Sequence, residues 1–215
     1  MTFARAYTAY LVAYSLALPL HAQSSQKPMV GEYYLTGVRE VGSGIKLNAD
    51  STFEFFFAYG ALDRFGKGTW KFHENQLLLN SAARPPKDFA LVTSRKEPGD
   101  GLMIRIVDPN KQLLHYVDCA IKNGTDIQQK ETNAEGLARF SEPGAEAISL
   151  RFQLCPDRYS VFTIDKGEHN YFEFRFEPWI AEVFFDHVGY RLVDGNLEGP
   201  LPLLEPGKTY SFVRE

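Results

Sequence analysis

The chain has 215 residues and a formal net charge of −4. An acidic chain without a basic patch or a basic helix is a poor partner for nucleic acid or for an anionic membrane surface. Aromatic residues make up 14% of the sequence, and strands favour them because aromatic rings pack well on a pleated surface. The composition therefore favours a β protein with one sizeable core or two smaller ones.

The first 22 residues have the features of an export signal. Arg5 gives a basic start, residues 8–20 are uncharged and mostly apolar, and Ala22 is a small residue suited to cleavage. This run is shorter than the roughly 20 residues that a membrane-spanning helix needs, and no later segment is apolar for long enough. We expect a signal peptide over 1–22 and export to the periplasm or the cell surface; the alternative is an uncleaved N-terminal anchor.

Strand patterns separated by short turns run from residue 29 to residue 95. Residues 52–59 are rich in aromatics and partly alternate, and shorter strand patterns follow at 68–72 and 76–80. No stretch shows a convincing helical face. We therefore expect an antiparallel, aromatic-rich meander over 29–95.

A second β module is expected over 100–165. It follows residues 96–101, where proline, glycine and charge occur together as at a boundary. Within it, the segment TNAEGLARF at 132–140 combines a turn-closing Asn133 with Gly136, which tolerates backbone angles that other residues avoid.

The C-terminal part, 170–215, continues the strand pattern. Phe172, Phe174 and Phe176 alternate with charged residues and so share one face of a half-buried strand. We expect these last strands to be able to complete the first sheet, with the middle module inserted between the two parts.

Two resemblances support this architecture. Residues 102–152, through IRIVDPN at 104–110 and TNAEGLARF at 132–140, resemble the transthyretin-like sandwich of carboxypeptidase regulatory domains, with Asn133 in place of the usual Asp. The resemblance implies a sandwich that acts as a spacer or binding module, and it assigns no site residue.

The second resemblance covers residues 31–79. The motifs GEY at 31–33, LNADSTF at 47–53 and GTW at 68–70 are similar to those of exported bacterial lipocalin-like meanders, with Ser51 in place of Gly. This implies a curled antiparallel sheet that can enclose a cavity. The expected fold class is therefore all-β, with a meander or partial lipocalin-like barrel plus a transthyretin-like sandwich.

The two cysteines, Cys119 and Cys155, allow two interpretations. An even pair in an exported protein invites a disulfide, which would contribute about 3–4 kcal/mol in the chain-entropy model. The alternative is two buried free thiols. The absence of nearby paired histidines argues against a structural zinc site.

The sequence carries no catalytic constellation. It has no G-x-S-x-G elbow, no phosphate-binding loop and no histidine pair with metal-ligand spacing, so we predict no catalytic residue, metal or cofactor. The best remaining candidate is the adjacent pair Asp186 and His187, although neighbouring strand residues point to opposite faces.

The aromatic meander is the strongest binding candidate. Phe55, Phe56 and Phe57 are consecutive, so aromatic rings occupy both faces of one strand, and an exposed face would mark an interaction site. We expect a non-catalytic binding or structural accessory protein of the cell envelope, whose partner is an envelope protein, a glycan or an apolar small molecule.

Two alternatives remain for the function. The first is a lipocalin-like carrier of an apolar molecule; the second is an envelope-polymer hydrolase. In the carrier, the cavity would be lined by Phe55, Phe57, Tyr59 and Trp70.

Overall fold

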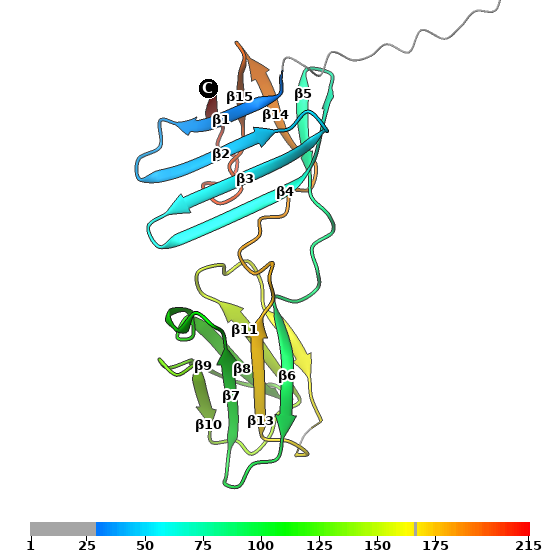
Figure 1. Cartoon of the computed structure of the whole chain (residues 1–215). Coiled ribbons are helices and arrows are strands. Elements are labelled where there is room, and N and C mark those ends of the chain that lie inside the picture. Colours follow the sequence, from blue (N-terminus) through cyan, green and yellow to red (C-terminus); the bar gives the residue numbers. More distant parts are fainter. Residues whose placement is uncertain (1–28, 166) are drawn as a thin grey trace, which may run out of the picture.

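The computed structural model describes residues 29–165 and 167–215 (Figure 1). These residues form sixteen strands, arranged as a closed barrel and two four-stranded sheets. The predicted fold class, all-β with a barrel and a sandwich, is confirmed. The signal peptide expected over 1–22 lies outside the described residues.

The barrel contains eight strands, and each pairs with its neighbours in antiparallel fashion. Their order around the barrel is β1-β16-β15-β14-β5-β4-β3-β2, and the pairing of β1 with both β16 and β2 closes the ring. The strands are β1 (Gly31–Thr36), β2 (Val41–Leu47), β3 (Thr52–Tyr59), β4 (Leu62–His73), β5 (Gln76–Asn80), β14 (Val188–Val193), β15 (Asn196–Gly199) and β16 (Tyr210–Arg214).

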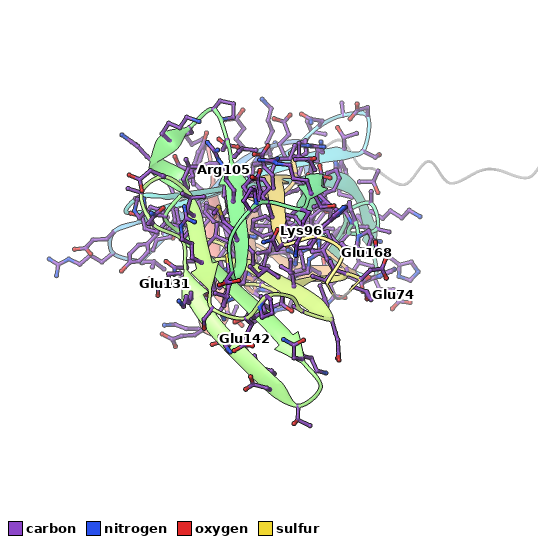
Figure 2. The ribbon with its side chains drawn as sticks, turned by 90° about the horizontal axis from the view of Figure 1, so that it is seen from below. Glu74, Lys96, Arg105, Glu131, Glu142 and Glu168 are labelled. Carbon is purple, nitrogen blue, oxygen red and sulfur yellow. The ribbon has the colours of Figure 1, made fainter. Side chains whose placement is uncertain are left out.

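The sandwich is formed by sheets of order β10-β7-β13-β6 and β12-β11-β8-β9. All of its strand pairs are antiparallel except β13 with β7, which is parallel. The strands are β6 (Phe89–Arg95), β7 (Leu102–Val107), β8 (Val117–Asn123), β9 (Asp126–Glu131), β10 (Leu137–Phe140), β11 (Ala147–Phe152), β12 (Ser160–Thr163) and β13 (Tyr171–Phe176). Figure 2 labels Lys96, Arg105 and Glu131, which are exposed charged residues of this unit.

The sandwich is inserted into the barrel between β5 and β14, and its limits differ from those expected from the sequence. β6 and β13 belong to the sandwich, not to the first meander and the C-terminal strands. The proline- and glycine-containing stretch 96–101 connects β6 to β7 inside the sandwich, so it is not a boundary. The alternation in β13 correctly indicates a buried face, but periodicity does not specify which sheet a strand joins.

Each unit has its own hydrophobic core. The sandwich core is formed by the inward faces of both sheets, including Ile104, Leu150 and Phe174, which are fully buried. The barrel interior holds a second, aromatic-rich core. Its fully buried members include Tyr33, Phe53, Trp70, Leu77, Leu79, Tyr190 and Phe212.

Backbone pairing joins the two units where β4 runs past the segment that precedes β14. The amide of Phe65 donates to the carbonyl of Ala181 at 3.3 Å, and the amide of Val183 donates to the carbonyl of Phe65 at 2.7 Å. Phe65 and Glu182 therefore form a parallel bridge. The first half of β4 is thus held between β3 and this connecting segment.

An ionic network, which we call the junction network, reinforces the connection. Arg64 of β4, only 4% exposed, forms a bidentate pair with Asp157 of the sandwich at 2.8 and 3.3 Å. Arg84 bridges Asp157 and Asp88 at 3.2 Å each, and Arg158 also binds Asp88. Arginine suits such sites because its planar fork matches a carboxylate.

The environment of Asp157 has opposing effects on its acidity. Burial raises the pKa of this carboxyl, but the hydrogen bond and charge of Arg64, together with Arg84, outweigh it and hold the pKa below its usual range. The carboxylate therefore stabilises the folded protein at pH values above its ordinary pKa of about 3.9. That contribution is lost as the pH falls through the lower folded-state pKa.

Candidate functional site

The four predicted ligand-binding residues do not line a common cavity. Phe55, Phe57 and Trp70 point into the barrel, where they are 3%, 3% and 1% exposed and pack against other core side chains. Tyr59 lies at the end of β3 and is 52% exposed. In the part of the chain that the structure describes, the barrel interior is filled by side chains.

The polar atoms of the interior aromatics are mostly satisfied by the backbone. The Trp70 Nε1–H donates to the carbonyl of Asn48 at 3.1 Å, and the Tyr33 hydroxyl donates to the carbonyl of Met29 at 2.8 Å. The Tyr190 hydroxyl has no hydrogen-bond partner among the described residues, and burial raises its pKa. These contacts indicate a packed structural core.

The outer face of β1–β4 carries aligned side chains that the sequence pattern did not single out as a group. Tyr34, Gly44, Phe56 and Phe65 are register partners across four successive strands. We call this set the aromatic row. It crosses three strand spacings, which corresponds to about 14 Å.

The aromatic row is partly exposed, and two of its rings are in contact. Phe56 and Phe65 are 44% and 41% exposed. The Phe56 ring lies over Gly44, where an added Cβ would come within 2.5 Å of the ring. The centroid of the Phe56 ring is 6.2 Å from the centroid of the Tyr34 ring. Glycine at position 44 therefore lets the ring lie flat on the sheet.

A second set of register partners, the charged row, lies beside the aromatic row. It consists of Glu32, Lys46, Glu54 and Lys67, so acids and bases alternate from β1 to β4. Lys46 Nζ is 3.0 Å from Glu32, which also accepts a 2.6 Å hydrogen bond from the Tyr34 hydroxyl. The hydrogen bonds from Tyr34 and Lys46 lower the pKa of Glu32, and the bond to Glu32 raises the pKa of Tyr34.

The aromatic and charged rows enclose a shallow hollow of about 330 Å³. Both rows contribute to its walls, so apolar ring faces and charged groups meet in one place. The lining residues are Glu32, Tyr33, Tyr34, Gly44, Ile45, Lys46, Glu54, Phe55, Phe56 and Phe65.

A larger hollow of about 640 Å³, the junction hollow, lies next to the first, and Glu54 lines both. Its other lining residues are Asn48, Thr52, Phe53, Lys67, Gly68, Thr69, Asn80, Ser81, Ala82 and Glu182. Gly68 is required in its wall: a Cβ there would lie 2.0 Å from the carbonyl oxygen of Asn80 and 2.8 Å from the Phe53 ring.

Cys119 and Cys155 are free thiols, so the disulfide considered from the sequence is not formed. Both are buried in the sandwich core, Cys119 on β8 and Cys155 in the turn after β11. Burial raises the pKa of both, that of Cys155 to about 11. The second interpretation, two buried thiols, describes the structure.

We expect both thiols to be protected from reagents in the folded protein. A thiolate is the reactive form, and burial suppresses it here. Titration with Ellman's reagent at pH 8 should detect no rapidly reacting thiol in the native protein and two after denaturation. A rapid reaction of the native protein would show that a thiol is accessible. A mass of the denatured protein that is lower by two hydrogens would show a disulfide. Either result would contradict two free, buried thiols.

Each histidine candidate has at most one polar side-chain partner among the described residues. Asp186 and His187 are hydrogen-bonded at 2.7 Å, but their side chains are 95% and 72% exposed. Ser94 Oγ lies 2.8 Å from His169 Nδ1, and no described carboxylate orients that histidine. Across 29–165 and 167–215, no group of three or more His, Cys, Asp or Glu residues could hold a metal ion.

Comparisons with known proteins give no match for this chain. No protein-family model matches the chain, and searches of curated proteins and of solved structures each give no significant match. No helix in the described ranges is long and apolar enough to cross a membrane. What the outer face can bind must therefore follow from its own residues.

Proposed function

We propose that the protein is an exported, non-catalytic accessory of the cell envelope that binds a glycan chain on the outer face of β1–β4. The observation that carries this proposal is the aromatic row, whose Phe56 and Phe65 remain exposed beside a row of alternating charges. Exposed apolar patches rimmed by polar residues mark interaction sites.

The chemistry of this face suits a saccharide. The flat, apolar C–H face of a sugar ring can stack on Phe56 and Phe65, while its hydroxyls reach the neighbouring charged row. That row contains two acids and two bases, so it offers both acceptors and donors without a net charge. The overall charge of −4 disfavours a polyanionic ligand.

The two alternative functions have less support. A carrier of an apolar molecule needs an open interior, whereas Phe55, Phe57 and Trp70 are packed inside the barrel. A hydrolase needs acidic or nucleophilic groups that converge in a pocket, and the side chains of Asp186 and His187 are largely exposed.

The sandwich has a supporting role in this proposal. We propose that it is a carboxypeptidase-regulatory-like module that acts as a spacer, as its resemblance implies. The junction network supports this role, because Arg64 and Asp157 connect β4 of the barrel directly to the sandwich. A rigid connection would fix the direction in which the aromatic row faces.

Isothermal titration calorimetry of the full chain with β-1,4-linked hexamers of glucose and of N-acetylglucosamine tests the proposal. Phe56→Ala and Phe65→Ala should each weaken binding about tenfold, because each removes one exposed stacking ring. Tyr159→Ala is the matched control, since this tyrosine is 38% exposed on the sandwich. Wild-type protein that binds neither hexamer, or equal affinity in all variants, would contradict the proposal.

A further inference from the structure

The aromatic row ends on a buried acid. Phe65 is bridged to Glu182 in parallel register, so these two residues lie on the same face of the extended sheet. The order across the face is therefore Tyr34, Gly44, Phe56, Phe65 and Glu182. The acid lines the junction hollow, which shares Glu54 with the hollow between the aromatic and charged rows.

Glu182 has an unusual environment for a carboxylate. It is only 9% exposed, yet its carboxylate forms no hydrogen bond or ion pair with another described side chain or backbone group. Its carboxylate oxygens are not among the fully buried, unpartnered side-chain atoms of the described residues, so they face the water-accessible space of the hollow.

The backbone holds Glu182 firmly in position. Its amide donates to the carbonyl of Trp179 at 2.9 Å, and its carbonyl accepts from the Arg64 guanidinium at 3.3 Å. A buried side chain on a fixed backbone loses little further conformational freedom when it binds. The backbone of Glu182 is thus fixed before a ligand arrives.

The charge of the hollow favours a cation. Its lining contains two carboxylates, Glu54 and Glu182, and one ammonium group, Lys67, so one negative charge is in excess. Lys67 is the register partner of Glu54 in the charged row, and it forms no ion pair with Glu182. Uncharged polar side chains complete the lining: Asn48, Thr52, Thr69, Asn80 and Ser81.

We propose that the junction hollow is a subsite for a glycan unit with a free amino group, whose ammonium binds the Glu182 carboxylate. This inference rests on the proposed glycan-binding function and names the kind of sugar that the site prefers. A chain stacked on Phe56 and Phe65 would place its next unit at the acid. An ammonium group supplies both the charge and the hydrogen-bond donors that Glu182 lacks.

The test compares two hexamers that differ only at the amino group: fully deacetylated β-1,4-glucosamine and its N-acetylated form. Calorimetry at pH 6 and low salt should show about tenfold tighter binding of the deacetylated hexamer by the wild-type chain. Glu182→Gln should abolish this preference and leave the affinity for the acetylated hexamer unchanged. Because the preference is electrostatic, it should weaken as salt increases.

Matched controls separate this inference from a structural effect. Glu131→Gln removes an exposed acid from β9 and should retain the preference. The melting temperature of Glu182→Gln should stay close to that of the wild type, because the carboxylate forms no ion pair that the substitution would break. A preference that survives Glu182→Gln, or equal wild-type affinity for both hexamers, would overturn the inference. In either case, loss of binding in Phe56→Ala would still support the proposed function.

Discussion

Replacing Arg64 by alanine is expected to lower the free energy of unfolding by about 3–5 kcal/mol, the range for breaking a buried ion pair. Arg64 is 4% exposed and donates to Asp157 of the sandwich and to the carbonyls of Ala181 and Glu182. Alanine removes these hydrogen bonds; Asp157 then keeps only Arg84, and the Ala181 carbonyl keeps only the Phe65 amide. Because the lost contacts connect the barrel to the sandwich, we also expect the wild type to unfold in one transition and the variant in two.

Urea unfolding followed by circular dichroism and by tryptophan fluorescence measures both effects. Arg39→Ala is the control, since Arg39 is exposed before β2 and should change stability by less than about 0.5 kcal/mol. Arg64→Ala should also lose part of the acid sensitivity that Asp157 confers at pH values below its ordinary pKa of about 3.9. Arg64→Ala protein with wild-type stability and a single transition would show that the junction network does not couple the units.

The second large effect is expected for Trp70→Ala, which should cost about 3–5 kcal/mol. Trp70 is 1% exposed in the centre of the barrel core, and its indole N–H satisfies the carbonyl of Asn48. Its removal would leave a large cavity and break the hydrogen bond to the Asn48 carbonyl. This outcome distinguishes a packing role from the ligand-lining role that the sequence first indicated for Trp70.

Phe65→Ala is the matched control for Trp70→Ala, because both residues lie on β4 and only Phe65 faces outward. Its effect on the free energy of unfolding, measured by the same urea titration, should stay within about 0.5 kcal/mol. A Trp70→Ala protein that is nearly as stable as the wild type would imply that the barrel interior is not packed as the structure shows.

Much of the architecture follows from local patterns. The alternation of Phe53, Phe55 and Phe57 with outward residues correctly indicates a strand with one buried face, and Gly136 has the positive φ expected of its turn. The possible completion of the first sheet by C-terminal strands also follows from these patterns. Such features are local, since they depend on residues that are close in sequence.

Other features depend on pairings between distant segments. No local signal shows that β13 pairs with β6 and β7 in the sandwich, because alternation specifies a buried face but not a neighbouring strand. The buried pair Arg64–Asp157 is separated by 93 positions, and Glu182 is separated from Phe65 by more than 100. Their residue types alone are those of ordinary surface charges.

The candidate site was predictable only in part. The consecutive residues Phe55, Phe56 and Phe57 indicate that aromatic rings occupy both faces of β3, and Phe56 is the exposed one. The sequence pattern favours the inward Phe55 and Phe57 as ligand residues, because a carrier would use its interior. The register that aligns Tyr34, Phe56 and Phe65 becomes visible only when the strands are paired.

The most direct test of the central claim is to map the binding surface by NMR. The full chain, labelled with ¹⁵N and with ¹³C on its aromatic rings, is titrated with the β-1,4-linked hexamer of N-acetylglucosamine. We predict that the largest shifts occur at Tyr34, Phe56 and Phe65, while the rings of Phe55 and Trp70 inside the barrel change little. Shifts confined to the barrel interior or to the sandwich would contradict a glycan-binding outer face.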